Sequence, residues 1–291
     1  GSHIEVAEVE LEIGVVPAVP RAKRILFDAY HNMQYPSPYI PRDNLADKKY
    51  MLDWLGDHPY TNYRMLFNML TRGGFSVELL RAPWTCFDAA QYGTLLVVDP
   101  EEEFSLTEIE KVEADVRNSQ LSVVIVADWH DEEELDKIRF FDDNTRSEWY
   151  PIVGGSNIPS INAFLGKFGG QFGLQTFSGT HRIEEKPIHF HTGNTIAQWP
   201  SGGMVIKAGA SQLKLVGKGN LRSNVNSDQI VVGAMTVSKQ VTGADGIKGV
   251  IGDNSVHAGR IVAYGDSSCF DDIGSSHVPG KNSSGAFNAE G

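Results

Sequence analysis

The sequence predicts an α/β protein with a doubly wound, mainly parallel sheet, and two observations lead to this prediction. In the first half, short aliphatic runs of strand length alternate with segments of helical periodicity. Strands that alternate with helices imply right-handed crossovers between parallel neighbours. In the second half, short strands joined by glycine-rich connections predict an antiparallel β extension, which rejoins the main sheet at residues 261–264.

Four runs in the first half have the continuous apolar character of buried strands. They are residues 25–27, 75–80, 94–98 and 121–127. Between the first two, residues 61–72 place four apolar side chains on one helical face, with Thr61 as the expected N-cap and two glycines at the end. Ser105 and Glu108 form an S-x-x-E capping box, which predicts a helix from there to about residue 118.

The second half and the two ends of the chain read differently. The run IAQWPSGGMVIKA at 196–208 predicts a hairpin with a Ser-Gly-Gly turn, and QIVVGAMTV and RIVAYGD predict further strands. Residues 1–20 are interpreted as a cloning remnant followed by a β-strand and linker from a preceding β-domain, and 21–272 as the α/β domain. Residues 273–291, rich in Gly, Ser and Asn, predict a flexible tail.

Bulk composition excludes two function classes. Lys and Arg total 25 against 37 Asp and Glu, a net charge of −12. An acidic chain of this kind does not favour sequence-independent nucleic-acid binding, which needs a basic face to displace counterions from phosphates. No apolar stretch approaches the roughly 20 residues of a membrane span, so no spanning segment is predicted.

Acidic residues follow the predicted parallel strands, where open α/β sheets usually hold ligands. Asp28, Asp128 and Asp266 are weak candidates for binding a hard cation such as Ca²⁺, with helix caps and solvated loop tips as the alternative. Cys86 and Cys269 also follow predicted strands. They could pair, which would be worth about 5 kcal/mol on the chain-entropy model, or they could be separate thiols.

The loop at 28–60 mixes aromatic and polar side chains, a composition typical of a recognition surface or of a tightly hydrogen-bonded loop. Structural packing is favoured over recognition for this loop, and the tryptophans of the chain are likewise favoured as core residues. The candidate crevice residues are Tyr30, His31, Arg42, Asp43, Asp57, His58 and Trp129. His189 and His191 would share one face of a strand, and a surface strand is favoured over zinc because no third ligand is identifiable from spacing.

No catalytic residue is predicted. Subtilisin-type catalysis needs an Asp, a His and a Ser from three separated elements. Asp28, His31 and Ser37 occur in that order, but they crowd one loop, and no Gly-Thr-Ser-x-Ala-type nucleophile context follows.

Several runs of the chain are too idiosyncratic for core packing alone, among them RILFDAYHNMQYPSPYIPRDNL from residue 24, LDWLGDHPYTNYR from 52, RFFDDNTRSEWYP from 139 and RIVAYGDSSCFDD from 260. Together they closely resemble the region after the catalytic domain in the site-1-protease family of subtilases. The resemblance implies a parent serine endopeptidase that acts on membrane-bound precursors in the lumen of the Golgi or endoplasmic reticulum. It also implies a Ca²⁺-dependent catalytic domain outside this chain, with no cofactor in the chain itself.

The expected role is therefore that of a non-catalytic accessory domain. Its expected partner is the parent's own protease domain, with a protein substrate or regulator as a further partner. The strand, acidic turn, capped helix and strand from 94 to 130 also resemble the class I glutamine amidotransferase-like fold. There the nucleophile elbow would fall on Asp128-Trp129-His130, which offers neither a thiol nor a glycine, so that chemistry is not expected.

Two rival functions remain. One is a small-molecule hydrolase or sugar-binding enzyme on an amidotransferase-like scaffold, which would use the acidic residues and a metal. The other is a protein-interaction domain with no link to proteolysis. An open, liganded crevice would favour the enzyme, whereas an occluded crevice with an exposed apolar patch elsewhere would favour docking.

Overall fold

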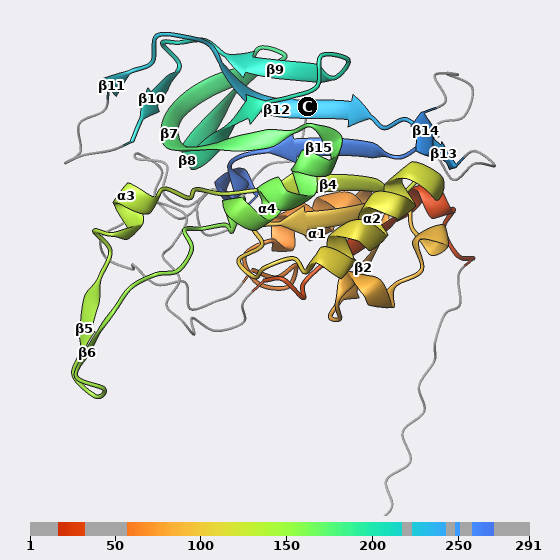
Figure 1. Ribbon diagram of the computed structural model, residues 1–291, viewed down its shortest axis with the longest axis horizontal. Helices are drawn as coiled ribbons and strands as arrows, with labels where there is room; N and C mark the ends of the chain where they lie inside the picture. The colour runs from red at the N-terminus through yellow and green to blue at the C-terminus, as the bar shows by residue number, and fades with distance from the viewer. Residues whose placement is uncertain (1–16, 33–56, 217–222, 243–247, 251–257, 271–291) are drawn as a thin grey trace, which may run out of the picture.

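The computed structural model describes residues 17–32, 57–216, 223–242, 248–250 and 258–270 (Figure 1). This part of the chain forms one 11-stranded sheet in the order β11-β10-β7-β8-β12-β15-β4-β3-β1-β2, with β9 paired to β12. The N-terminal strand predicted before residue 17 and the predicted tail after 272 lie outside the described residues. Among the helices that are described, none is both long and apolar enough to cross a membrane.

One half of the sheet is parallel, as predicted. Its strand order, β2-β1-β3-β4-β15, reverses direction between β1 and β3, which is where open α/β sheets usually place a ligand. The predicted strand ends are correct to within a residue. The strands are β1 (Arg24–Asp28), β2 (Ser76–Leu80), β3 (Thr94–Val98), β4 (Ser122–Val126) and β15 (Arg260–Tyr264).

Helices cover both faces of the parallel half, so the sheet is doubly wound. The covering helices are α1 (Arg64–Arg72), α2 (Leu106–Asn118) and α4 (Ile158–Leu165), whereas the short helix α3 (Glu132–Leu135) lies in the segment that leads to β5 (Figure 1). Figure 1 shows α2 and α4 side by side, and both contribute to one core together with Leu95 and Val97 of β3. The intervening residues Leu96 and Val98 face the second core, which α1 covers. This alternation follows from the two-residue period of a strand.

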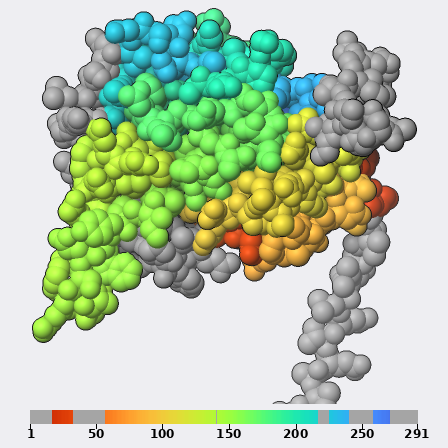
Figure 2. All heavy atoms as spheres, viewed as in Figure 1, coloured from red at the N-terminus to blue at the C-terminus, as the bar shows by residue number. Residues whose placement is uncertain are grey.

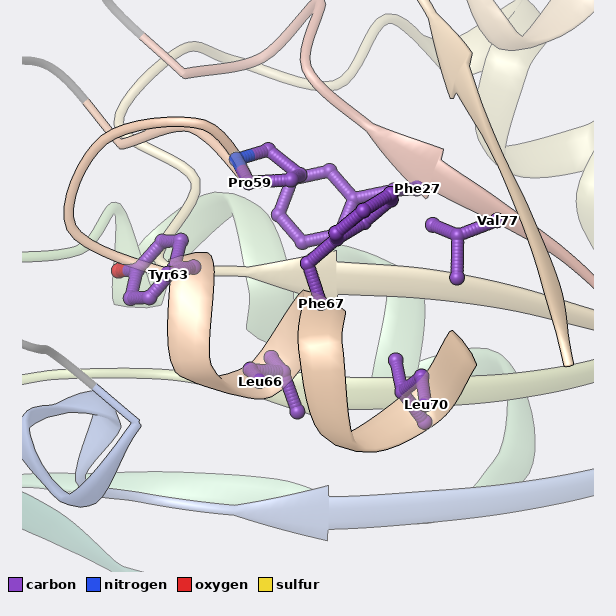
Figure 3. A pocket seen from close by; sticks show the side chains of 7 residues that line it. All are labelled: Phe27, Pro59, Tyr63, Leu66, Phe67, Leu70 and Val77. Carbon is purple, nitrogen blue, oxygen red and sulfur yellow. The ribbon is translucent and has the colours of Figure 1, made fainter. Parts of the chain in front are cut away.

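Helix α1 packs on the second face through aromatic and aliphatic side chains. They line a narrow pocket with no room for a water molecule (Figure 3). The lining side chains are Phe27, Pro59, Tyr63, Leu66, Phe67, Leu70 and Val77. The pocket lies at the contact between helix and sheet, so it belongs to the core.

The two predicted helix starts had different outcomes. The capping box before α2 is confirmed: Ser105 accepts the backbone N–H of Glu108, and the Glu108 carboxylate accepts the N–H of Ser105. The cap at Thr61 is wrong, because α1 begins at Arg64. Thr61 lies in a preceding turn, where its N–H and its hydroxyl both donate to the carbonyl of His58.

The second half forms the predicted antiparallel extension. Strand β12 pairs antiparallel with β15, and β15 pairs parallel with β4, so the extension rejoins the main sheet at 261–264 as predicted. A long β7–β8 hairpin that the sequence did not reveal forms much of it. The strands are β7 (Gln171–Ile183), β8 (Lys186–Gln198), β9 (Met204–Ala208), β10 (Leu213–Leu215), β11 (Ser223–Asn224) and β12 (Gln229–Thr236).

The hairpin predicted at 196–208 is wrong in its pairing. Strand β8 ends at Gln198 and β9 begins at Met204, but each of them pairs with β12 and neither with the other. The physical reason lies in the connection. Trp199 packs against Gly233 of β12, where an added Cβ would lie 2.5 Å from the indole, and so the turn carries the chain across β12.

Two small two-stranded sheets stand apart from the main sheet. They are β5 (Phe140–Asp142) with β6 (Ser147–Trp149), and β13 (Gln240–Thr242) with β14 (Lys248–Val250).

Candidate functional site

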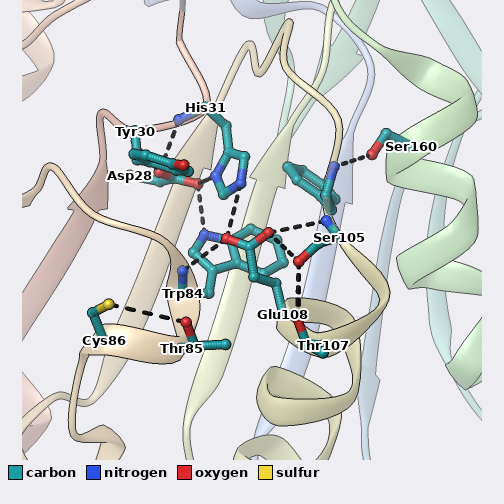
Figure 4. Close-up of polar contacts among 11 residues, drawn as sticks. Asp28, Tyr30, His31, Trp84, Thr85, Cys86, Ser105, Thr107, Glu108 and Ser160 are labelled. Carbon is teal, nitrogen blue, oxygen red and sulfur yellow. Dashed lines mark hydrogen bonds and ion pairs between the residues drawn. The ribbon is translucent and has the colours of Figure 1, made fainter.

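A buried polar network follows strand β1 at the point where the strand order reverses (Figure 4). The Asp28 carboxylate pairs with His31 Nδ1 at 2.7 Å and accepts the indole N–H of Trp84 at 2.7 Å. On its other side, His31 Nε2 lies 3.3 Å from the Glu108 carboxylate. Glu108 in turn accepts the backbone N–H of Trp84 at 2.9 Å. An imidazole thus lies between two carboxylates, both of which also hold Trp84.

The network around Asp28 is closed to solvent. Asp28, His31, Trp84 and Glu108 are all buried, and the His31 ring meets Trp84 and Phe104 edge-on at 5.0 and 4.8 Å. Burial alone would raise the pKa of Glu108. The bonds it accepts from Ser105 and from the N–H of Trp84 nevertheless hold that pKa below its usual value. Because a substrate cannot reach these groups, their arrangement stabilises the fold.

A second buried network follows strands β3, β4 and β15. The Ser267 hydroxyl donates to Asp99 at 3.2 Å and to Asp128 at 3.1 Å. The Ser156 hydroxyl donates to Asp99 and accepts the N–H of Asp128 at 2.7 Å. Asp266 accepts the N–H of His191 at 2.7 Å. These acidic side chains are therefore held by hydroxyl and backbone donors.

The second network holds Asp99, Asp128 and Asp266 close together, and all three are fully buried. Burial, and then the charges of Asp99 and Asp266, raise the pKa of Asp128 well above its ordinary value. Burial also raises the pKa of Asp266 to about 7. A carboxyl whose pKa is raised on folding keeps its proton while the unfolded chain loses it. Its contribution to stability is therefore lost as pH rises from its usual pKa near 4 to the raised one.

We predict that Asp128→Asn becomes more stable relative to the wild type as pH rises from about 5 to 8, because the amide cannot ionise. Each unit by which the pKa of Asp128 is raised corresponds to about 1.4 kcal/mol. Urea unfolding at both pH values measures the difference. The control is Asp142→Asn, because the Thr145 hydroxyl holds the pKa of Asp142 below its usual value, so its effect should be equal at pH 5 and 8. An Asp128→Asn effect independent of pH would contradict the prediction.

The three aspartates considered as cation ligands do not form one site. Asp28 is bonded to His31 and Trp84, whereas Asp128 and Asp266 belong to the second network. Among the residues described, no group of three or more His, Cys, Asp or Glu side chains is arranged to hold a metal ion.

Trp129 follows strand β4, in the turn compared above with the nucleophile elbow of an amidotransferase. Its side chain is 0% exposed, which corrects its interpretation as a crevice residue. Its N–H donates to Asp128 at 2.6 Å, and its carbonyl lies so close to Gly154 that a Cβ there would be 2.1 Å away. The backbone around the elbow is therefore fixed by close packing.

The two cysteines are free thiols, so the pairing alternative is not realised. Cys269 Sγ lies 3.6 Å from the carbonyl of Asp266. Both cysteines are exposed at the surface of the protein.

The remaining crevice candidates do not form one site, because they differ in burial and in hydrogen-bond partners. Asp57 is buried and accepts the Asn62 amide, and Asn62 accepts the N–H of His58 at 3.1 Å, so this part of the loop is a hydrogen-bonded turn. Burial, and then the charge of Arg81, lower the pKa of His58. Tyr30 is exposed, whereas His31 is not. Arg42 and Asp43 lie outside the described residues.

One hydroxyl does meet an imidazole in the described part of the chain. Thr180 Oγ1 lies 3.1 Å from His189 Nδ1, and the two residues are directly opposite on β7 and β8. The pair is exposed on the surface of the sheet, and the ring next to it, at 6.0 Å, is His191. A nucleophile and base also need an orienting acidic group and a cleft. This pair is a cross-strand contact of an ordinary kind.

Sequence reasoning missed several members of both networks. Glu108 was read only as a helix cap, although its carboxylate also reaches Trp84 and His31. Asp99 was recognised as one of the acidic residues that follow the strands, but its partners Ser156 and Ser267 were not. These residues all lie directly after a strand or before a helix at the same edge of the sheet. This position would identify them as neighbours only once the strand order is known.

A family model and curated relatives both match this chain over most of its length. The family model for the fourth GATase-like domain of MBTPS1 matches residues 19–282. Subtilisin-like protease SBT6.1 of Arabidopsis thaliana is 38% identical over 286 residues, which are 96% of this chain and 25% of that protein. Membrane-bound transcription factor site-1 protease of Cricetulus griseus is 39% identical over 273 residues, which are 93% of this chain and 24% of that protein. The chain thus spans about a quarter of the length of these curated relatives.

Among solved structures, the mmIFT52 N-terminal domain covers 86% of this chain and 89% of its own length. Its sequence identity to this chain is 11% and its TM-score is 0.48.

Proposed function

Because the chain belongs to the family of the fourth GATase-like domain of MBTPS1, we propose that it is a non-catalytic accessory domain of a site-1-protease-like subtilase. Its task would be to support the protease domain or to position substrate and partners. The parent protein would be a serine endopeptidase that processes membrane-bound precursors in the lumen of the Golgi or endoplasmic reticulum. Any Ca²⁺ requirement would then belong to the catalytic domain and not to this chain.

The observation that supports this proposal most strongly is the filling of the sheet edge where α/β enzymes hold reacting groups. Asp28, Asp128, Trp129 and Ser267 are each 0% exposed there. An enzyme would need an activated atom that a substrate can reach. At this edge the side chains instead bond to one another.

The chemistry of these groups points the same way. In the described residues, the buried hydroxyls of Ser156 and Ser267 donate to carboxylates, and the imidazole of His31 faces two carboxylates. A serine nucleophile needs an imidazole that takes its proton. A small-molecule hydrolase on this scaffold would need carboxylates that a substrate can reach. The burial of Asp28 and Asp128 argues against this alternative function.

The proposal predicts how a longer relative responds to loss of this domain. Deleting the matching region from a site-1-protease relative should lower the yield of active protease several-fold, because the catalytic domain loses a folding or docking partner. Secretion and cleavage of a peptide substrate would be measured together. The control is the same protease with its catalytic serine replaced, which should be secreted normally but be inactive. Full activity and yield without the domain would contradict a supporting role.

A further inference from the structure

A two-stranded arm, residues 139–152, projects from the body of the protein. Strand β5 pairs only with β6 among the described strands, with Phe141 opposite Glu148. Figure 2 shows the arm as a lime-green protrusion at the lower left. An isolated two-stranded hairpin is at best marginally stable in water. A projecting arm therefore needs internal bonds, a partner surface, or both.

Internal bonds fix the tip of the arm. The Asp142 carboxylate accepts the N–H of Asn144 at 2.9 Å and the Thr145 hydroxyl at 2.8 Å. The indole N–H of Trp149 donates to the same Thr145 hydroxyl at 3.2 Å. Arg146 has a φ of 52°, in the left-handed region that non-glycine residues rarely adopt. The turn is thus held in one shape before any partner arrives, which lowers the entropic cost of docking.

The arm exposes three large apolar side chains. Phe141 is 57% exposed, Tyr150 48% and Ile152 69%. Phe141 and Tyr150 lie on one face of the hairpin, since Phe141 pairs with Glu148 and Tyr150 follows two residues later. The Tyr150 hydroxyl donates to Glu148 at 2.9 Å, and the Arg139 guanidinium lies 5.1 Å from the Tyr150 ring centre. Aromatic side chains combined with arginine are typical of the energetic centres of protein interfaces.

Negative charge is concentrated at the base of the arm, in and around the short helix α3, and the arm itself adds three acidic residues against two arginines. Residues 131–152 contain eight Asp and Glu against three Lys and Arg. Interfaces pair surfaces of opposite potential, so this surface fits a partner whose apolar pocket has a basic rim.

We infer that the arm docks into an apolar pocket with a basic rim on the protease region of the longer polypeptide, an inference that rests on the proposed function. The relatives matched here extend to about four times the length of this domain, so such a polypeptide has ample surface to receive the arm. A partner in the same polypeptide would meet the arm at a high effective concentration because the two are tethered.

The test measures binding of the purified 291-residue chain to the purified catalytic region of a site-1-protease relative. Phe141→Asp and Tyr150→Asp should each weaken binding at least about tenfold, because both place a charge in an apolar pocket. The matched control is Leu174→Asp on β7, where the leucine is 53% exposed, and it should bind like the wild type. Binding should also weaken as NaCl rises from about 50 to about 500 mM.

Two further measurements make the outcomes distinct. Thermal unfolding of the arm variants should match the wild type, since the arm lies outside the main sheet. Amide hydrogen exchange of residues 139–152 in the wild type should slow on binding, a readout that needs no variant. If the wild type binds but neither substitution nor exchange responds, the arm inference falls and the proposed function stands. If the wild type does not bind the catalytic region, the arm inference falls together with direct support of that domain.

Discussion

Replacing Asp28 by alanine should lower the free energy of unfolding by about 3–5 kcal/mol, because it removes a shared acceptor from a buried polar network. The substitution leaves the His31 imidazole and the Trp84 indole N–H without their acceptor in a closed site. It also removes the acceptor of the backbone N–H groups of Tyr30 and His31. Urea unfolding followed by circular dichroism measures the loss.

The control for Asp28→Ala is Glu110→Ala, which removes an exposed carboxylate from α2, two residues beyond the buried Glu108. Surface changes of this kind usually stay within about 0.5 kcal/mol. If Asp28→Ala cost as little as this control, then Asp28 would not have a structural role. A functional role for Asp28 and His31 would then have to be considered again.

Replacing Trp129 by alanine should cost about 3–5 kcal/mol, the usual range for removing a large aromatic side chain from a packed site. The side chain is fully buried, and the backbone around it is held by Ser156 and by the close approach of Gly154. Neither backbone contact can close the space left by the indole. The expected result is a protein that unfolds at a lower urea concentration with unchanged secondary structure.

The control for Trp129 is Trp149→Ala, which removes the same side chain from the arm, where it is partly exposed. This change should lower the free energy of unfolding by about 1 kcal/mol or less, because the partly exposed Trp149 side chain buries little apolar surface on folding. A cost below 1 kcal/mol for Trp129→Ala, together with an altered activity of the longer protease, would instead identify Trp129 as a contact residue.

The parallel half of the fold could be predicted from sequence because local signals and burial agree there. Residues 94–98 are aliphatic throughout and form β3 with those bounds, and the capping box at Ser105 and Glu108 starts α2. The β7–β8 hairpin was missed because β8 buries polar side chains. Asn194 is fully buried, and its amide bonds to the carbonyls of His130 and Gly173. A hydrophobic pattern cannot reveal a buried strand whose buried residues are polar.

The location of the candidate site could be predicted from sequence, but its division into two networks and its burial could not. The aspartates after the strands were recognised, and they do lie at the edge of the sheet where ligands usually bind. Sequence could not show that Asp28 and Asp128 belong to separate networks, because the partners that separate them, Trp84 and Ser267, come from distant parts of the chain. Exposure also depends on packing between distant segments, which explains why His31 and Trp129 were taken as crevice residues.

The measurement that tests the central claim most directly is covalent labelling of the folded chain by mechanism-based probes. A fluorophosphonate reports an activated serine, and a diazo analogue of glutamine reports an amidotransferase-type cysteine. Peptide mass spectrometry before and after denaturation in urea would locate any adduct. A structural, non-catalytic domain predicts no residue that reacts faster in the folded chain than in the unfolded one. Stoichiometric labelling of one serine or cysteine that is lost on unfolding would show an activated nucleophile and contradict the account.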